Sequence, residues 1–359
     1  MNIIGVQAGA GWTLIGALVL WGLSGCASSG PRHSILDLGP LPDFSSSHAL
    51  AINSSGQVAG FVEDSNGDCK AVLWTRGTPL DLGTLGGKGS KAWALNDAGQ
   101  VVGESFLTGN TLRRAFVWQN GAIHPLDVAG APGSAAYAIN RLAQAVGQRN
   151  GPTGSGTAYA FHYSSGRLAE LPSQGLSGSS AAGINSAGDV VGWNLTADSV
   201  LRRACVWKGG QRRDLGTPPG NRSWASAINE NGDVVGSWQP EVGDTPSPSA
   251  YYHLEVVHAF IWRRGRFTDL GTLKGGLSSE AEAVNKLDQV VGQGDIGAGD
   301  THAILWQDGH PFDLNTLIPQ ASGWTLQEAT GINDAGQICG IGLVNGALHG
   351  FLLTPYSRS

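Results

Sequence analysis

Three glutamates in the last third of the chain are the side chains whose type and spacing best suit catalysis. Glu280 and Glu282 stand two residues apart in one short run, and Glu328 occupies a similar run further along. Residues two apart in a β-strand share one face and lie roughly 7 Å from each other. Glycoside hydrolysis uses two carboxyl groups, one as acid and one as nucleophile or base. These residues therefore suggest one possible function, that of a hydrolase acting on envelope polysaccharide, which we weigh below against a noncatalytic role.

No other catalytic signature accompanies these carboxylates. The sequence has no G-x-S-x-G elbow, no H-E-x-x-H motif and no P-loop. Its four cysteines show no C-x-x-C spacing, and its formal net charge of −6 gives no basic stripe for nucleic acid. We therefore expect no cofactor, no metal ion and no nucleic-acid partner.

A polar residue recurs at seven places directly before an Ala-Phe-type segment. Three of these residues are histidines, but they stand in separate repeats and are not expected to converge on one metal ion. Buried polar groups normally find partners, so we expect each to pair with the Asp of a recurrent D-L-G segment or with a recurrent Ser. The seven residues are Lys70, Arg114, Tyr159, Arg203, His258, His302 and His349.

Candidate binding residues lie where the recurrent pattern varies. Two double arginines, at 113–114 and 202–203, can contact carboxylated glycans or phosphate, and the alternative is a solvated surface charge. The insertion 239–257 carries two tyrosines typical of contact loops, and the alternative is a tolerated insertion without a function. The candidate binding residues are Arg113, Arg202, Trp193, Trp238, Tyr251 and Tyr252.

The elements that must position these residues form a repeat. A segment of the type S-x-A-x-A-I-N-x-x-G-Q-V-V-G returns about every 44 residues, followed by A-F-x-W and D-L-G-T-L, which is the spacing of repeat arrays. Abundant Gly and sparse charge suit short strands with tight turns. The Asn of the repeat occurs seven times, at Asn53, Asn96, Asn140, Asn185, Asn229, Asn285 and Asn333.

Each repeat predicts four short strands in an antiparallel meander. We therefore predict an all-β fold, a seven-bladed β-propeller of four-stranded antiparallel blades over residues 35–355, because radial packing covers both apolar faces of each sheet. The chain enters on a D-L-G run at Asp37 and leaves after a third-strand run that ends at Leu353. The N-terminal strand should thus pair with the last blade and close the ring. An open β-solenoid is the alternative.

The N-x-x-G and W-x-x-G turns fall on one end of such a ring, and that end is expected to be mostly structural. The loops between second and third strands and the connections between blades share the other end. Their lengths and composition vary, and variable loops on a rigid scaffold are where binding usually resides.

These motifs resemble the HAF-repeat family of probable extracellular repeat proteins. The resemblance spans residues 35–355 and includes His258-Ala259-Phe260 itself. It implies an exported bacterial protein of propeller-like fold, and it brings no catalytic residues.

The N-terminus resembles a bacterial lipoprotein signal. Cys26 follows an apolar stretch and the small residues Ser24 and Gly25, and in such signals the cysteine becomes the acylated N-terminus. A plain signal peptide or an uncleaved anchor is the alternative. The resemblance implies a signal peptide at 1–25, a tether at 26–34, the propeller, and a tail at 356–359. It also implies an outer-membrane lipoprotein or cell-surface location, with a periplasmic or secreted protein as the alternative.

Three cysteines remain after such cleavage. Cys205 replaces the Phe of the Ala-Phe segment and should pack as a small buried hydrophobe. Cys69 and Cys339 fall in the first and last repeats, which a ring would make neighbours, so a disulfide between them stays open.

Taken together, the residues favour a noncatalytic exported binding or scaffold propeller, lipid-tethered, with a protein or glycan ligand. The polysaccharide hydrolase built on Glu280, Glu282 and Glu328 and a purely structural envelope protein are the alternatives.

Overall fold

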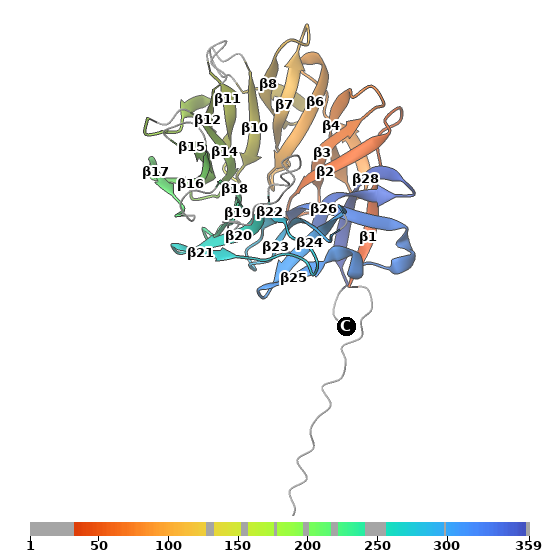
Figure 1. The fold of residues 1–359 in the computed structure, drawn as a ribbon. Helices are drawn as coiled ribbons and strands as arrows, with labels where there is room; N and C mark the ends of the chain where they lie inside the picture. The colour runs from red at the N-terminus through yellow and green to blue at the C-terminus, as the bar shows by residue number, and fades with distance from the viewer. Residues whose placement is uncertain are drawn as a thin grey trace, which may run out of the picture. The chain divides into compact units, whose positions relative to one another are not determined.

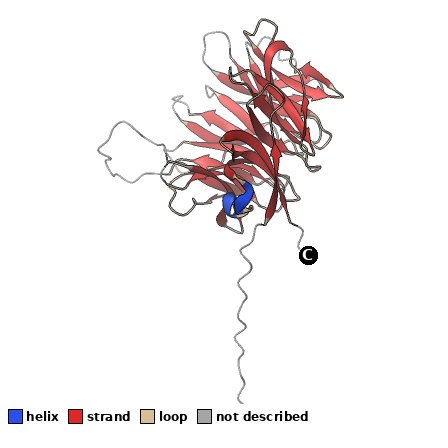
Figure 2. Ribbon diagram, turned by 90° about the vertical axis from the view of Figure 1, so that its right-hand side faces the viewer, coloured by secondary structure: helices blue, strands red, loops and turns tan. Residues whose placement is uncertain are grey.

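The structure is a computed structural model that describes residues 32–126, 133–151, 157–175, 178–196, 201–216, 222–240, 256–297 and 299–356. These residues form seven four-stranded antiparallel sheets, arranged as the blades of a β-propeller (Figure 1). Viewed from the side, strands dominate and the helical turns are isolated (Figure 2). The predicted all-β propeller is confirmed.

The strands of each blade follow one another in sequence, from the first strand to the fourth. The first strands are β2 (Ser46–Ile52), β6 (Gly86–Leu95), β10 (Ser134–Ile139), β14 (Ser179–Ile184), β18 (Ser223–Ile228), β22 (Ser279–Val284) and β26 (Trp324–Ile332). The second strands are β3 (Val58–Glu63), β7 (Val101–Leu107), β11 (Ala145–Asn150), β15 (Val190–Leu195), β19 (Val234–Trp238), β23 (Val290–Asp295) and β27 (Ile338–Val344).

The third strands are β4 (Cys69–Thr75), β8 (Arg113–Gln119), β12 (Ala158–Ser164), β16 (Arg202–Lys208), β20 (His258–Arg263), β24 (Thr301–Gln307) and β28 (Ala347–Pro355). The fourth strands are β5 (Thr78–Asp81), β9 (Ala122–Pro125), β13 (Arg167–Glu170), β17 (Gln211–Asp214), β21 (Arg266–Asp269), β25 (His310–Asp313) and β1 (His33–Leu38). We number the blades 1 to 7 in the order of their first strands.

Two 3₁₀ turns, η1 (Leu314–Thr316) and η2 (Gln320–Ser322), interrupt the strands between blades 6 and 7. No helix among the described residues has the length and apolar character needed to cross a bilayer.

The N-terminal strand closes the ring. β1 pairs antiparallel with β28, from His33 opposite Pro355 to Leu38 opposite Gly350, so the first and last strands share blade 7 (Figure 1). Leu38 packs with Val58 and Trp74 of blade 1. The open solenoid is therefore wrong, and the strand begins two residues before the expected start of the propeller at 35.

Apolar side chains between neighbouring blades hold the ring together. One such cluster joins Leu73 of blade 1 to Leu95 and Phe116 of blade 2, and each of the other clusters likewise joins adjacent blades. The V-V-G segments supply the valines of these clusters. Their glycines lie against the backbone of the first strand, where a Cβ at Gly103 would meet the Lys91 carbonyl oxygen at 1.9 Å. Alternating buried positions on short strands thus account for the blade stacking.

In blades 1 to 6, a serine near the start of the first strand ties the blade to its predecessor. The Ser90 hydroxyl accepts the N–H of Ala71 at 3.0 Å and donates to the Gly83 carbonyl at 2.7 Å. At the point of ring closure, Ser47 accepts the N–H of Gly350 at 2.9 Å. The same bond recurs from Ala115, Ala160, Ala204 and Ala259 to Ser134, Ser179, Ser223 and Ser279.

The seven asparagines form a closed circle of hydrogen bonds around the axis. Each side-chain amide donates to the backbone carbonyl of the next asparagine, and its oxygen accepts backbone N–H groups of its own turn, as Asn140 does from Leu142 and Gln144. All seven are buried, so these bonds satisfy groups that would otherwise be costly. The donor–acceptor steps are Asn53 to Asn96, Asn96 to Asn140, Asn140 to Asn185, Asn185 to Asn229, Asn229 to Asn285, Asn285 to Asn333, and Asn333 to Asn53.

Candidate functional site

Five of the seven recurrent polar residues before the Ala-Phe segments belong to the scaffold in the way predicted. In five of the seven blades this residue pairs with the aspartate of the neighbouring fourth strand. None of these pairs shares a partner with another blade, and among the described residues no group of three His, Cys, Asp or Glu side chains is placed to hold a metal ion. The pairs are Lys70–Asp81 at 2.8 Å, Arg203–Asp214 at 3.6 Å, His258–Asp269 at 2.8 Å, His302–Asp313 at 2.7 Å and His349–Asp37 at 2.9 Å.

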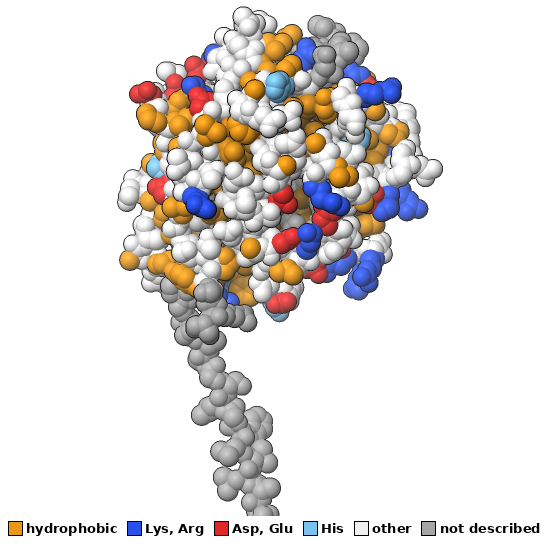
Figure 3. Space-filling view, turned by 180° about the vertical axis from the view of Figure 1, so that it is seen from behind, with side chains coloured by type: hydrophobic (Ala, Val, Ile, Leu, Met, Phe, Trp, Pro, Cys, Tyr) orange, Lys and Arg blue, Asp and Glu red, His pale blue; other side chains and the backbone are white. Residues whose placement is uncertain are grey.

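The end of the ring that carries the asparagine circle is a funnel of about 490 Å³. Aliphatic residues directly before the asparagines line it, together with charged residues directly after them, such as Asp97, Arg141 and Glu230. The charged residues also tie blades together, since the Glu230 carboxylate accepts the Ser186 hydroxyl at 2.6 Å. On the face shown in Figure 3, acidic and basic side chains lie close together near the middle. The asparagine end thus combines its funnel with extensive structural bonding.

We call the opposite end of the ring the mouth. The residue five positions before each asparagine lies at this end. These positions pair with the residue after the V-V-G glycine, as Lys91 does with Glu104 and Glu280 with Gln293. Unlike the asparagines, they do not repeat one residue type. They are His48, Lys91, Ala135, Ser180, Trp224, Glu280 and Glu328.

Blades 6 and 7 give the mouth an acidic side. Burial raises the pKa of Glu280 and, together with the Glu280 carboxylate, that of Glu328. Burial and then the charges of Glu328 and Glu280 raise the pKa of Glu282 to about 8. The three glutamates predicted from the sequence therefore do lie within electrostatic reach of one another. Among the described residues, no hydrogen bond or ion pair engages their carboxylates.

The spacing assumed for Glu280 and Glu282 does not hold in detail. A β-bulge between Ala281 and Ala283 inserts Glu282 as the unpaired residue of β22, and a bulge bends the strand and interrupts its alternation. The same bulge recurs at Trp93, between Ala92 and Ala94 of β6.

Blades 1 to 3 give the mouth an aromatic and basic side. The rings of His48 and Phe61 stack at 4.2 Å, and Phe61 meets Trp93 edge-on at 6.5 Å. Trp93 in turn meets Tyr137 edge-on at 6.0 Å, and its buried indole N–H has no hydrogen-bond partner. The Lys91 ammonium lies 4.1 Å from the centre of the Phe61 ring, a cation–π contact.

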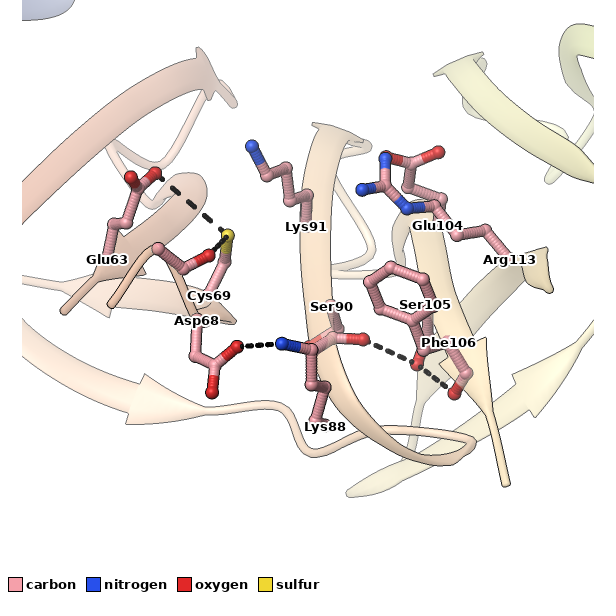
Figure 4. A pocket seen from close by; sticks show the side chains of 12 residues that line it. Glu63, Asp68, Cys69, Lys88, Ser90, Lys91, Glu104, Ser105, Phe106 and Arg113 are labelled. Carbon is pink, nitrogen blue, oxygen red and sulfur yellow. Dashed lines mark hydrogen bonds and ion pairs between the residues drawn. The ribbon is translucent and has the colours of Figure 1, made fainter. Parts of the chain in front are cut away.

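Two pockets adjoin this side of the mouth and share Glu104, Phe106 and Arg113. The blade 1–2 pocket has a volume of about 300 Å³ (Figure 4), and the blade 2–3 pocket, which also contains Tyr137, about 430 Å³. In the first, Lys91 projects between Glu63 on one side and the Glu104–Arg113 pair on the other (Figure 4).

Arg113, a candidate binding residue, faces both pockets. Its guanidinium donates to Glu104 at 2.9 Å and lies 4.6 Å from the centre of the Phe106 ring. Burial raises the pKa of Glu104, although the charges of Arg113 and Lys91 oppose that shift. The free edge of the guanidinium leaves Arg113 able to contact an anionic group.

The other predicted binding residues lie apart from these pockets. Arg202 lies 4.7 Å above the ring of Trp193 in blade 4. Trp238 contacts Phe267 at 5.2 Å and His258 at 6.5 Å, which gives it a packing role in blade 5. Tyr251, Tyr252 and Cys26 lie outside the described residues.

The three described cysteines are free thiols. Cys205 is buried in the core between blades 3 and 4, as expected of a small hydrophobe. Cys339 is buried between blades 7 and 1, whereas Cys69 is partly exposed and lines the blade 1–2 pocket. The ring does make their blades neighbours, but the disulfide left open between Cys69 and Cys339 is absent.

Sequence reasoning missed Glu63, Lys91, Glu104 and Tyr137 as site residues. Each stands at a position that varies between repeats: five residues before an asparagine (Lys91), three residues before one (Tyr137), directly after the V-V-G glycine (Glu104), or at the end of a second strand (Glu63). Variation at these positions, within a repeat whose other positions are nearly constant, is the sequence signal that could identify them.

No protein-family model matches this chain, and no curated protein matches it. Among solved structures, it is similar to the β-propeller domain of the Trilobed protease from Pyrococcus furiosus, with 10% identity and a TM-score of 0.53, covering 87% of this chain and 94% of that one. That propeller is described as having an open velcro topology, whereas β1 closes the ring here.

The chain is also similar to a puromycin-hydrolysing peptidase from Mycobacterium tuberculosis, with 11% identity and a TM-score of 0.58 over 91% of this chain. A puromycin hydrolase matches with 12% identity and a TM-score of 0.57 over 86% of this chain. The chain spans about half the length of these two enzymes, 55% and 51%. At such identities the likeness shows the fold alone.

Proposed function

We propose that this protein is a noncatalytic binding propeller whose ligand, a protein or a glycan, binds at the mouth. The observation that carries the proposal is that the charges of the mouth are not used by the scaffold. Among the described residues, Lys91, Glu280 and Glu328 have no ion-pair partner, whereas the recurrent polar residues further out are paired with aspartates. Half-buried charges normally find a partner, and a ligand would supply it.

The chemistry of the mouth suits such ligands. Partly exposed aromatic rings, among them Trp93 and Trp224, provide flat apolar contact area, and aromatic residues are enriched at binding surfaces. The carboxylates across the ring can accept hydrogen bonds from hydroxyl or amine groups. A few polar groups set among aromatic walls are typical of ligand sites.

The direct test is binding of the propeller, residues 31–359, to a glycan array. Retention of one glycan class would support a glycan ligand. Silence on the array would favour a protein partner, to be sought by photo-crosslinking from position 224. If crosslinks form only from the funnel at position 141 and never from the mouth, the proposal fails.

A second candidate function is hydrolysis of envelope polysaccharide, and one observation favours it. Glu282, with its pKa raised to about 8 beside Glu280 and Glu328, would be protonated at neutral pH, as a general acid must be. Its neighbour could then act as nucleophile or base. The test is product release from cell-wall polysaccharides: activity that Glu282→Gln abolishes would establish the enzyme, and bound but intact glycan would exclude it.

We further propose that Cys26 is the acylated N-terminus of an exported lipoprotein and that the protein stands at the outer membrane or cell surface. The support is the sequence alone, in which small residues precede the cysteine and Ala27 and Ser28 follow it. The HAF-repeat resemblance, which implies export, agrees with this location.

A further inference from the structure

The blade 1–2 pocket is a separate small site beside the mouth. Its walls come from the end of β3, the turn before β4, the strands β6 and β7, and the start of β8. Its volume of about 300 Å³ is at the lower end of the range for small-molecule sites, roughly 300–1,000 Å³. A ligand of that size is a single small molecule or the equivalent of one or two residues.

Six charged side chains line this pocket, three of each sign, and four of them are paired. Lys88 contacts Asp68 at 2.6 Å, and Arg113 contacts Glu104 at 2.9 Å. The formal charges therefore sum to zero. The two charges left over are opposite in sign, Glu63 and Lys91.

Glu63 and Lys91 do not neutralise each other. Among the described residues neither takes part in an ion pair, and they stand on different strands, β3 and β6, on facing sides of the pocket (Figure 4). The Glu63 carboxylate has only a long contact from the Cys69 thiol at 4.0 Å, and the Lys91 ammonium rests 4.1 Å from the centre of the Phe61 ring. Each therefore keeps its charge available to a ligand.

We propose that this pocket binds a small zwitterion with an apolar side group, from the class of free amino acids or short peptides. The ligand's ammonium would contact Glu63, its carboxylate would contact Lys91, and its side group would pack on the ring of Phe106 in the pocket wall. A ligand with one charge would leave either Glu63 or Lys91 without a partner inside the site, which is unfavourable. The charge balance of the pocket thus selects for both charges together. This site goes beyond the mouth ligand proposed above: it shares Lys91 with the mouth and adds Glu63 and Cys69, which are not mouth residues.

Cys69 provides a direct reporter of occupancy. It lines the pocket and is partly exposed, whereas Cys205 and Cys339 are fully buried. A bound ligand should therefore slow the alkylation of Cys69, which mass spectrometry of the Cys69 peptide measures separately from any other thiol.

The experiment titrates the full chain with L-phenylalanine and with the dipeptide Gly-Phe, followed by Cys69 protection and calorimetry. The control ligands are 3-phenylpropionate, which lacks the ammonium, and 2-phenylethylamine, which lacks the carboxylate. We expect protection by at least one zwitterion, and binding at least about tenfold weaker for both controls, since each loses one charged contact. The tighter of the two zwitterions identifies the source as amino acid or peptide.

Glu63→Gln separates the site from the mouth, whereas Lys91→Met removes a charge that belongs to both. Glu63→Gln and Lys91→Met should each weaken the zwitterion about tenfold or more at unchanged melting temperature. Lys274→Met, at an exposed lysine remote from the pocket lining, and Trp224→Ala at the mouth should leave it unchanged. Equal protection by a singly charged control, or no protection by either zwitterion at about 10 mM, would overturn the proposal whatever the outcome for the mouth ligand.

Discussion

The side-chain amide of Asn333 donates a 3.0 Å hydrogen bond to the backbone carbonyl of Asn53, 280 residues away in sequence. This bond completes the circle, in which the side-chain amide of each of the seven asparagines donates to the backbone carbonyl of the next one around the ring. The circle joins the first strands of blades 7 and 1, while the pairing of β1 with β28 joins the first and last strands within blade 7. The ring is thus closed in two ways. The residue type at its asparagine end is the same in all seven blades, whereas the residues at the mouth differ from blade to blade.

Removing one asparagine from the circle should destabilise the whole ring. Asn140 is 4% exposed and donates to Asn185 at 2.9 Å and to Gln144 at 2.7 Å. Asn140→Ala leaves buried groups unsatisfied, so we expect the free energy of unfolding in urea to fall by about 2–4 kcal/mol. Asn66→Ala, at an exposed asparagine whose bonds stay within its own turn, is the control and should cost less than about 0.5 kcal/mol. Equal losses in both variants would contradict the role of the circle.

The closing strand offers a matched pair of leucines. Leu38 of β1 is 1% exposed in the core between blades 7 and 1, whereas Leu36 in the same strand is 42% exposed. Leu38→Ala should lower the free energy of unfolding by about 2–5 kcal/mol because it leaves a cavity. Leu36→Ala should cost under about 1 kcal/mol. If both variants melt like the wild type, β1 does not contribute to closure.

Glu282 should make the protein less stable as the pH rises. An unfolded glutamate titrates near about 4.3, whereas in the fold its pKa is raised to about 8. Between these values the folded state keeps a proton that the unfolded chain has lost, so the free energy of unfolding falls from about pH 4.5 to pH 8. Because Glu282 is partly accessible to water, we expect its share to be on the order of 1–3 kcal/mol, less than the full shift implies.

Urea unfolding at pH 5 and pH 8 measures the contribution of Glu282 to this loss of stability, when the wild type is compared with a variant that lacks the carboxylate. Glu282→Gln should flatten the decline and be more stable than the wild type at pH 8. Asp300→Asn, at an exposed aspartate without a side-chain partner among the described residues, should follow the wild type. A Glu282→Gln variant with an unchanged decline would show that Glu282 ionises normally.

The cysteines should differ sharply in reactivity. Burial raises the pKa of the Cys339 thiol to about 12 and that of Cys205 still further. Because the thiolate is the reactive species, neither should react with a thiol reagent until the protein unfolds. Cys69 is partly exposed, although burial raises its pKa too, and it should react in the native state and faster at higher pH. Native-state labelling of Cys339 would contradict the described core.

The lipid anchor is tested by metabolic labelling with a palmitate analogue. Wild-type protein should carry the label and partition with membranes, and Cys26→Ala should lose both properties. The Cys69→Ala variant, which alters another cysteine, is the control and should keep them. Labelling that survives Cys26→Ala would remove the lipoprotein proposal.

The fold could be predicted almost completely because its signals are local and occur seven times. Period-two runs, Asn and Gly turns, and a D-L-G strand at Asp37 without a preceding blade specify the meander and its closure. The pairing of the recurrent polar residues with aspartates also follows from alternation along neighbouring strands, as in His302–Asp313.

The site could be predicted only in part. The gathering of Glu280, Glu282 and Glu328 follows from first strands around one axis, but their spacing depends on a bulge between Ala281 and Ala283. The pocket between blades 1 and 2, by contrast, depends on which side chains of the two adjacent blades meet. Such contacts between units cannot be read from one repeat, because they arise from packing rather than from the pattern within a blade.

The central claim, that ligands bind at the mouth, is tested most directly by the affinity of an array-identified glycan or a crosslinked protein partner for two variants. Trp224→Ala removes an aromatic ring from the mouth, and Arg141→Ala removes an exposed charge from the funnel at the asparagine end. We predict at least a tenfold loss of affinity for Trp224→Ala, about 1.4 kcal/mol or more, and unchanged affinity for Arg141→Ala. A loss for Arg141→Ala with none for Trp224→Ala would place the ligand at the opposite end and contradict the claim.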